Sequence, residues 1–377
     1  MLIHLICAAR PNFMKIAPLY HALKREPWTN PLIIHTGQHY DLNMSDAFFI
    51  DLGLPNPDIN LGVGSGTHAE QTGKVMIAYE KVLMEQRPDL VVVVGDVNST
   101  VACTLAASKV HFSRHQPSAM SYERGHRPLV AHLEAGLRSF DRSMPEEVNR
   151  LVTDVLADIL WTPSQDADEN LIKEGVSTDK IQRVGNIMLD SLEMLREKIE
   201  TQEAYRNFDL KPKGYGLVTL HRPSNVDDPE ALSRLCNIVV KIAKKIPLVF
   251  PIHPRTRKNL EQNQLLQIVE NNKRLFLPDP LSYIRFMNMV FNCRFVITDS
   301  GGIQEETTYL GIPCLTMRPN TERPVTISQG TNQLCEVKDL EEKAEAIISG
   351  RIPQANKIEY WDGKTANRIV EFLRGLA

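Results

Sequence analysis

The sequence lacks the features that would assign it to several common protein classes. No apolar run reaches 18 residues, so no membrane-spanning segment is expected. The formal net charge is only −3, which gives no electrostatic reason to bind nucleic acid or an anionic membrane. The apolar start, "MLIHLICAAR", is too short for a signal peptide and has no basic region before it, so it predicts a β-strand. With these classes excluded, the sequence is expected to form an ordinary globular protein.

Cysteine is scarce and shows no pattern. The six cysteines form no C-x-x-C pair, and each lies in or near an apolar segment: Cys7, Cys103, Cys236, Cys293, Cys314 and Cys335. They are expected to be small buried residues of a reducing compartment, not disulfides or metal ligands. The sequence therefore predicts a cytoplasmic protein without a metal site.

Two glycine-rich phosphate motifs are also missing. Neither half of the chain has G-x-G-x-x-G after its first strand, so no dinucleotide cofactor is indicated. There is no G-x-x-x-x-G-K-[ST] either, which argues against a nucleotide-hydrolysing motor. No cofactor is expected.

Short apolar runs alternate with segments of helical period along the whole chain. Runs that are apolar at every position are typical of strands covered by helices on both faces. The expected strands are 2–9, 32–36, 90–96, 129–134, 159–162, 181–184, 216–221, 248–253, 274–278, 294–300, 313–317 and 333–337, with helices such as 67–86, 146–158 and 230–245 between them. Two successive sets of βα units predict an α/β protein of two Rossmann-like, doubly wound domains.

The length of 377 residues also suits two domains. We place the joint near "VGNIMLDS", which gives a first domain of 1–184 and a second of 185–362. The last helix, 363–377, either continues the second domain or returns to the first, and periodicity does not decide between them. The polar, basic segment 111–128 carries two prolines and is expected to be an exposed insertion.

Charged side chains follow several predicted strands, where open α/β sheets bind ligands. Arg10 and Lys15 follow the first strand and suit a phosphate, although a solvated helix start explains them as well. Asp96 follows the strand at 90 and could simply cap the next helix. Glu134 ends the strand at 129, where burial could raise its pKa. Glu146 and Glu147, taken alone, would merely open a helix.

The second half repeats this pattern. His221 stands at a strand end, where a lone histidine is more often structural than functional. Ser300, Gly301 and Gly302 precede a helix and allow close backbone approach, which predicts an anion cradle. Glu306 comes one turn later, where a carboxylate could accept both hydroxyls of a ribose. A plain capped helix is the alternative.

Taken together, these stretches carry a family resemblance over nearly the whole chain. It resembles the non-hydrolysing UDP-N-acetylglucosamine 2-epimerases in the ordered motifs "ARPNFMK", "TGQHYD", "VGDVNST", "HLEAGLRS", "PEEVNR", "TLHRPSNVD", "TDSGGIQEE" and "TERP". The resemblance implies the GT-B fold, in which two Rossmann-like domains face a cleft and the last helix packs back on the first domain. It also implies a homodimer that interconverts UDP-GlcNAc and UDP-ManNAc without NAD or metal.

Site residues follow from the resemblance motif by motif. It implies catalytic roles for Asp96, Glu134, Glu146, His221 and Lys15. It implies contacts with the nucleotide sugar for Arg10, Arg150, Ser300, Gly301, Gly302 and Glu306. Gln38 matches a motif that in some members helps bind a second, activating UDP-GlcNAc. The implied route eliminates UDP from C1 as the C2 proton leaves, passes through 2-acetamidoglucal, and adds UDP back.

Some features depart from this pattern. Ala8 and Ala9 replace the family's usual Gly-Thr before the Arg-Pro pair, and the 111–128 segment is longer than usual. "TGQHYDLNMS", "GSGTHAEQTG" and "HPRTR" resemble a subgroup that includes epimerases of UDP-2,3-diacetamido-2,3-dideoxyglucuronate. That substrate stays open, as do a GT-B glycosyltransferase and a hydrolysing epimerase. A non-catalytic nucleotide-sugar sensor is disfavoured, because all three acidic positions are present.

Overall fold

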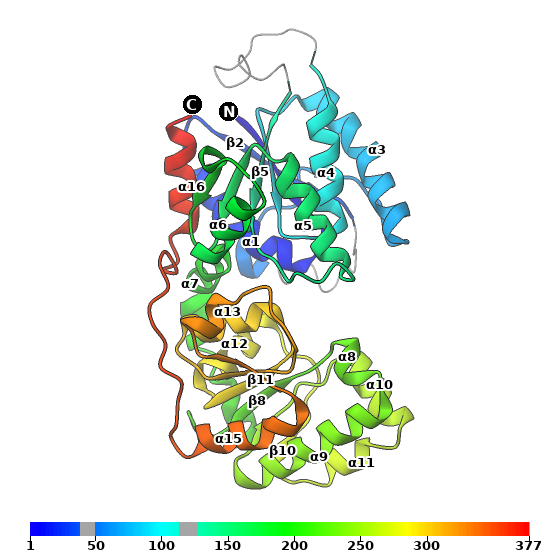
Figure 1. The fold of residues 1–377 in the computed structure, drawn as a ribbon, viewed down its shortest axis with the longest axis vertical. Coiled ribbons are helices and arrows are strands. Elements are labelled where there is room, and N and C mark those ends of the chain that lie inside the picture. Colours follow the sequence, from blue (N-terminus) through cyan, green and yellow to red (C-terminus); the bar gives the residue numbers. More distant parts are fainter. Residues whose placement is uncertain (38–49, 113–126, 377) are drawn as a thin grey trace. The chain divides into compact units, whose positions relative to one another are not determined.

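The computed structural model describes residues 1–37, 50–112 and 127–376 (Figure 1). Gln38 and most of the 111–128 segment lie outside these residues. The chain divides into two compact units: Met1–Met194 together with Glu359–Ala377, and Leu195–Ile358. The division falls inside helix α7 (Ile187–Glu200), whereas the sequence placed the joint just before that helix.

The first unit contains a seven-stranded parallel sheet in the order β3-β2-β1-β4-β5-β6-β7. Its strands are β1 (Leu2–Cys7), β2 (Asn30–His35), β3 (Ile59–Asn60), β4 (Leu90–Val94), β5 (Leu129–Leu133), β6 (Ile159–Thr162) and β7 (Ile181–Arg183). All the strands predicted for this half are present. The sequence missed β3, because two residues carry no alternation that could reveal them.

The helices of this unit are α1 (Arg10–Lys24), α3 (His68–Gln86), α4 (Asn98–Lys109), α5 (Pro145–Leu156), α6 (Gln165–Lys173), α7 and α16 (Thr365–Arg374). α3, α4 and α5 pack in succession, and α16 packs against α1. The carboxylate of Asp190 on α7 accepts the backbone N–H groups of Thr365 and Ala366 and so caps α16. The last helix therefore belongs to the first unit.

The second unit contains a six-stranded parallel sheet in the order β10-β9-β8-β11-β12-β13. Its strands are β8 (Gly216–Thr219), β9 (Leu248–Val249), β10 (Leu275–Phe276), β11 (Phe295–Thr298), β12 (Cys314–Thr316) and β13 (Asn332–Leu334). Its helices are α8 (Pro223–Val226), α9 (Pro229–Lys245), α10 (Pro254–Gln262), α11 (Leu266–Glu270), α12 (Tyr283–Asn292), α13 (Gly301–Tyr309), α14 (Val325–Ser328) and α15 (Leu340–Ile348). The predicted two-domain α/β fold is confirmed.

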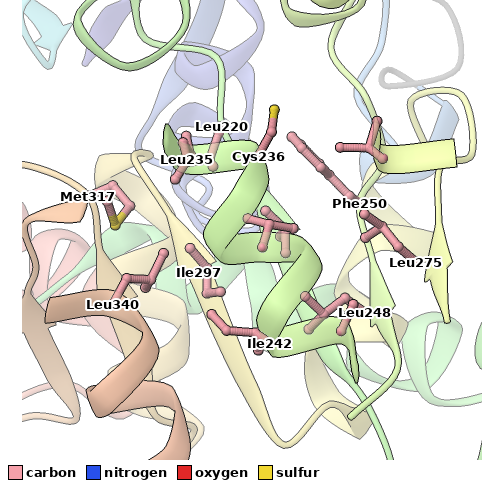
Figure 2. Packing of buried hydrophobic residues seen from close by; sticks show 14 of the residues in the cluster. Leu220, Leu235, Cys236, Ile242, Leu248, Phe250, Leu275, Ile297, Met317 and Leu340 are labelled. Carbon is pink, nitrogen blue, oxygen red and sulfur yellow. The ribbon is translucent and has the colours of Figure 1, made fainter. Parts of the chain in front are cut away.

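Apolar side chains on one face of α9 build the core of the second unit (Figure 2). Leu235, Cys236 and Ile242 lie in the same buried cluster as Ile297 of β11 and Leu248 of β9. Each buried leucine or isoleucine contributes about 1.5–3 kcal/mol through removal from water. α9 starts where the Asp228 side chain accepts the N–H of Ala231, with a proline in the first turn.

Both sheets reverse their strand order at an equivalent place. In the first, the order turns between β1 and β4, and in the second between β8 and β11. Parallel strands end at the same edge of a sheet, and ligands bind where the order reverses. The residues that follow β1, β4, β5, β8 and β11 are therefore the candidates for a ligand-binding site.

Two further expectations from the sequence concern the cysteines and membrane-spanning segments. All six cysteines are buried and free, as the sequence predicted. No helix in the described ranges is both long and apolar enough to cross a membrane.

Candidate active site

The turn after β1 is held by the side chain of Asn12. Its oxygen accepts the N–H groups of Ala8 and Ala9, and its amide donates to the carbonyl of Val94 at the end of β4. This ties the start of α1 to the neighbouring strand end. Lys15, in the second turn of α1, is 9% exposed. Arg10 opens the helix, but its side chain lies outside the described part of the structure.

Glu134 follows β5 in an unusual backbone conformation. Its φ is +73°, in the left-handed region that residues other than glycine rarely occupy. The residue is 5% exposed. One carboxylate oxygen, Oε2, accepts a hydrogen bond from Lys15 Nζ, while the buried Oε1 has no partner among the described residues. Backbone strain of this kind concentrates at functional sites, and an unpaired buried oxygen costs stability unless a ligand uses it.

Asp96, Arg150 and Glu147 form a chain of ion pairs beside the end of β4. Arg150 donates to Asp96 Oδ2 through Nε at 3.0 Å and Nη2 at 2.6 Å, and to Glu147 Oε2 through Nη1 at 2.5 Å. The Asp96 side chain is 31% exposed, whereas those of Arg150 and Glu147 are almost fully buried. Arg150 thus fixes the Asp96 carboxylate while leaving it accessible.

The two adjacent glutamates of α5 have different surroundings. Glu147 also accepts the N–H and hydroxyl of Ser139 and the N–H of Phe140, so it anchors the loop after β5. Glu146 is exposed in the first turn of the helix. The sequence selected Glu146 and passed over Glu147; adjacent helical positions point about 100° apart, and only the folded loop shows which one is buried.

A charged network lies beneath these residues. Both ring nitrogens of His132 are bonded, Nδ1 to Asp154 Oδ1 at 2.5 Å and Nε2 to the carbonyl of Gly95 at 2.8 Å. Asp154 also accepts the N–H of Gly136 and pairs with Arg138 at 2.7 Å. Burial alone would raise the pKa of Asp154, but the charges of His132 and Arg138 lower it. The network fixes the turns that carry Asp96 and Glu134.

In the second unit, His221 is oriented by Asp299. His221 Nδ1 lies 3.0 Å from Asp299 Oδ1, and the imidazole is 40% exposed. Asp299 also accepts the backbone N–H groups of His221 and Arg222 and the amide of Asn225. Burial opposes ionisation of Asp299, but the hydrogen bonds from His221 and Asn225 lower its pKa. The ring of His253 lies 5.6 Å from that of His221.

The predicted anion cradle stands at the start of α13. A side chain at Gly301 would come within 2.8 Å of Arg323 Nη1 and 3.1 Å of Glu322 Oε1, whereas one at Gly302 would meet nothing within 4 Å. The helix N-terminus and the Arg323 guanidinium are therefore close together, which suits an anion.

Arg323 of "TERP" lies beside this cradle and Arg318 lies nearby in the chain; the sequence had indicated no role for either. Arg323 pairs with Glu322 at 2.7 Å and with Glu305 at 2.9 Å, and Arg318 pairs with Glu322 at 2.8 Å. Burial would raise the pKa of Glu322, yet Arg323 and Arg318 hold it well below its usual range. The clustering of charges in "RPNTERP" was the only available signal, since Glu305, the partner from α13, is not local in sequence.

Glu306 lies on the second turn of α13 and is 2% exposed. Its Oε1 accepts the hydroxyl of Tyr283 at 2.7 Å. Burial raises the pKa of Glu306 to about 7; the Tyr283 hydrogen bond opposes this shift, and the charge of Glu305 adds to it. A buried acid that ionises only near neutral pH destabilises the fold, which is typical of a residue retained for function.

Glu306→Gln is therefore expected to stabilise the protein at alkaline pH. Because its folded pKa lies above the unfolded value, Glu306 costs stability progressively as pH rises from about 4.5 to 7. We expect a gain of about 1–3 kcal/mol at pH 8 and less than about 1 kcal/mol at pH 5, since one pKa unit corresponds to about 1.4 kcal/mol. Urea midpoints at both pH values measure this. Equal shifts at the two pH values would contradict the ionisation argument.

Among the described residues, no group of three or more His, Cys, Asp or Glu side chains is placed to hold a metal ion. The fold is GT-B-like, with two Rossmann-like α/β domains, and the charged residues beside the strand ends are of the kind that enzymes use for acid–base chemistry. Comparison with known proteins identifies the family. The family model described as UDP-N-acetylglucosamine 2-epimerase matches residues 21–374.

A UDP-N-acetylglucosamine 2-epimerase of Methanocaldococcus jannaschii is 42% identical over 388 residues, covering 99% of both chains. A crystal structure of the enzyme from the same organism, in complex with UDP-GlcNAc and UDP, matches with a TM-score of 0.84 and 39% identity over 100% of both chains. A UDP-2,3-diacetamido-2,3-dideoxy-D-glucuronate 2-epimerase of Pseudomonas aeruginosa is 36% identical, covering 98% of this chain and 99% of its own. The chain therefore belongs to the UDP-N-acetylglucosamine 2-epimerase family, a family of isomerases.

Proposed function

We propose that this protein interconverts UDP-GlcNAc and UDP-ManNAc without hydrolysis. The observation that carries the proposal is the Glu134 carboxylate, with one oxygen bonded to Lys15 and the other buried and unpaired among the described residues. Such an oxygen suits a base that accepts a proton from carbon. The substrate is inferred from the relatives, because the side chains alone indicate only an acid–base reaction.

The proposed reaction has two steps. In the first, the C1–oxygen bond to UDP breaks, the C2 proton passes to Glu134, and the electron pair of the C2–H bond forms the C1=C2 double bond of 2-acetamidoglucal. In the second, an oxygen of UDP attacks C1 and a carboxylic acid on the opposite face gives its proton to C2. The UDP released in the first step is thus consumed in the second, and both acid groups return to their starting states by proton exchange with solvent, so no oxidant or other co-reactant is needed.

Each group of residues has a part in these steps. The α13 N-terminus at Ser300, Gly301 and Gly302 and the imidazole of His221 stabilise the charge that develops on the leaving diphosphate. Arg10 is proposed to assist. The ammonium of Lys15 stabilises the Glu134 carboxylate. The Glu306 carboxylate accepts hydrogen bonds from the ribose hydroxyls.

The carboxylate on the other face of C2 is either Asp96 or Glu146. Arg150 holds Asp96 in place and leaves it accessible, and Glu146 is exposed at the start of α5. Comparing solvent-proton exchange at C2 in Asp96→Asn and Glu146→Gln separates the two, since only one variant should lose proton return to the new face.

A proton NMR time course with UDP-GlcNAc in deuterated water tests the function. We expect UDP-ManNAc that carries deuterium at C2, with no free ManNAc. Free ManNAc together with UDP would instead establish a hydrolysing epimerase, and transfer of the sugar to an added acceptor would establish a glycosyltransferase.

A second candidate substrate is UDP-2,3-diacetamido-2,3-dideoxyglucuronate. The Pseudomonas aeruginosa relative with that name covers 98% of this chain at 36% identity, which favours this sugar as the alternative. Turnover of this sugar in the same assay, with no exchange on UDP-GlcNAc, would select it. The proposal also includes a cytoplasmic homodimer, and light scattering of the purified protein tests the dimer.

A further inference from the structure

We propose that Tyr283 is a positioning residue for ribose recognition, whose hydroxyl holds the Glu306 carboxylate so that its second oxygen faces the ribose of a uridine nucleotide. The inference rests on the proposed function, because it takes a uridine diphosphate compound as the ligand. It adds a residue from a different helix, α12, to the nucleotide site on α13.

The contact between the two side chains is directional. Tyr283 Oη donates to Glu306 Oε1 at 2.7 Å, across 23 positions of sequence. Burial and then the Glu306 charge raise the pKa of the Tyr283 phenol well above its usual value, so the phenol stays protonated and remains the donor. The Tyr283 hydroxyl bonds Oε1 of Glu306, which leaves Oε2 as the oxygen that the proposal assigns to the ligand.

Glu306 itself is 2% exposed, and the face of α13 beside it is open at Gly302. Gly302 and Glu306 are four residues apart in α13 and so share one face of the helix, about 6 Å from each other. A side chain at Gly302 would meet nothing within 4 Å. A diphosphate at the helix N-terminus would therefore place the adjoining ribose along this face, within reach of the free carboxylate oxygen.

The bond to Tyr283 also favours the charged form that ribose hydroxyls need. A carboxylate accepts hydrogen bonds from both hydroxyls, whereas a protonated acid loses acceptor capacity. Burial raises the pKa of Glu306 to about 7, and the Tyr283 hydrogen bond counteracts that rise. Without the hydroxyl, the acid would be free to turn and would be protonated more readily.

The test compares binding of UDP with binding of 2′,3′-dideoxy-UDP by calorimetry, because the second ligand lacks both hydroxyls. Tyr283→Phe is expected to weaken UDP binding roughly tenfold, as a hydrogen bond to a charged group is a strong one, and to leave dideoxy-UDP binding unchanged. Glu306→Gln should also lose the preference for UDP. The double variant should be no worse than Glu306→Gln, because the tyrosine acts through the acid.

Tyr215→Phe is the matched control. The Tyr215 hydroxyl is also buried and donates to the carbonyl of Met289 at 2.7 Å, so the variant loses a similar bond in the same unit. It should show a similar change in melting temperature with an unchanged ratio of the two affinities.

Two outcomes would overturn the inference. Equal weakening of both ligands by Tyr283→Phe would show that the hydroxyl supports only the fold, and no weakening of either would show that Glu306 needs no positioning. If the unchanged protein binds neither ligand, the proposed function fails and this inference fails with it.

Discussion

Replacing Glu134 with glutamine is expected to lower kcat about a thousandfold, the size of effect usual for loss of a general base. The amide keeps the shape of the side chain but cannot accept a proton from carbon. Binding of UDP should change little, because the residues proposed to bind it follow β8 and β11 or lie on α13, in the second unit. Incorporation of deuterium at C2 of UDP-GlcNAc measures the proton-transfer step directly and should fall by the same factor.

This change is expected to cost some stability, because Lys15 is largely buried and keeps its charge without the Glu134 carboxylate. Turnover and exchange are therefore compared per amount of folded protein. Glu200→Gln, at an exposed glutamate paired only within α7, is the control and should keep full turnover. Near-normal exchange in folded Glu134→Gln protein would contradict the role of Glu134 as the base.

The positions of Lys15, Asp96 and Glu134 could be predicted because each follows a buried strand. Parallel strands that are apolar throughout are recognisable in the sequence, and the topology rule then brings their carboxyl ends together. The structure adds that Lys15 contacts Glu134, a pairing across 119 positions that no local pattern encodes. It also adds the positive φ of Glu134, which a sequence indicates reliably only for glycine.

Other contacts could not be predicted, since they depend on how helices dock. Glu147 and Glu146 are equivalent in the sequence, and the choice between them is made by the backbone of residues 139 and 140 folding onto α5. Tyr283 reaches Glu306 only because the fold brings the first residue of α12 close to α13. The role of His132 could not be predicted for a different reason. It lies within an apolar strand and resembles a satisfied core histidine, although its ring bonds the Gly95 carbonyl.

The second prediction with a large expected effect concerns the buried network of His132, Asp154 and Arg138. Asp154→Asn is expected to destabilise the protein by about 3–5 kcal/mol, because removing one partner of a buried ion pair leaves the other charge uncompensated. Asp154 accepts bonds from His132, Gly136 and Arg138 at once. An asparagine would turn its amide hydrogens toward at least one of these donors. A large downward shift of the urea midpoint measures the loss.

The control for this variant is Glu174→Gln, which affects the other partner of Arg138. The Glu174 side chain is 33% exposed, so water replaces its interaction and the loss should stay below about 1 kcal/mol. Asp154→Asn should also lower turnover in the protein that stays folded, since Gly95 and Gly136 flank Asp96 and Glu134. A midpoint shift no larger than that of Glu174→Gln would mean that the buried charges are not what fixes these turns, and strand packing alone would then have to account for the strained backbone at Glu134.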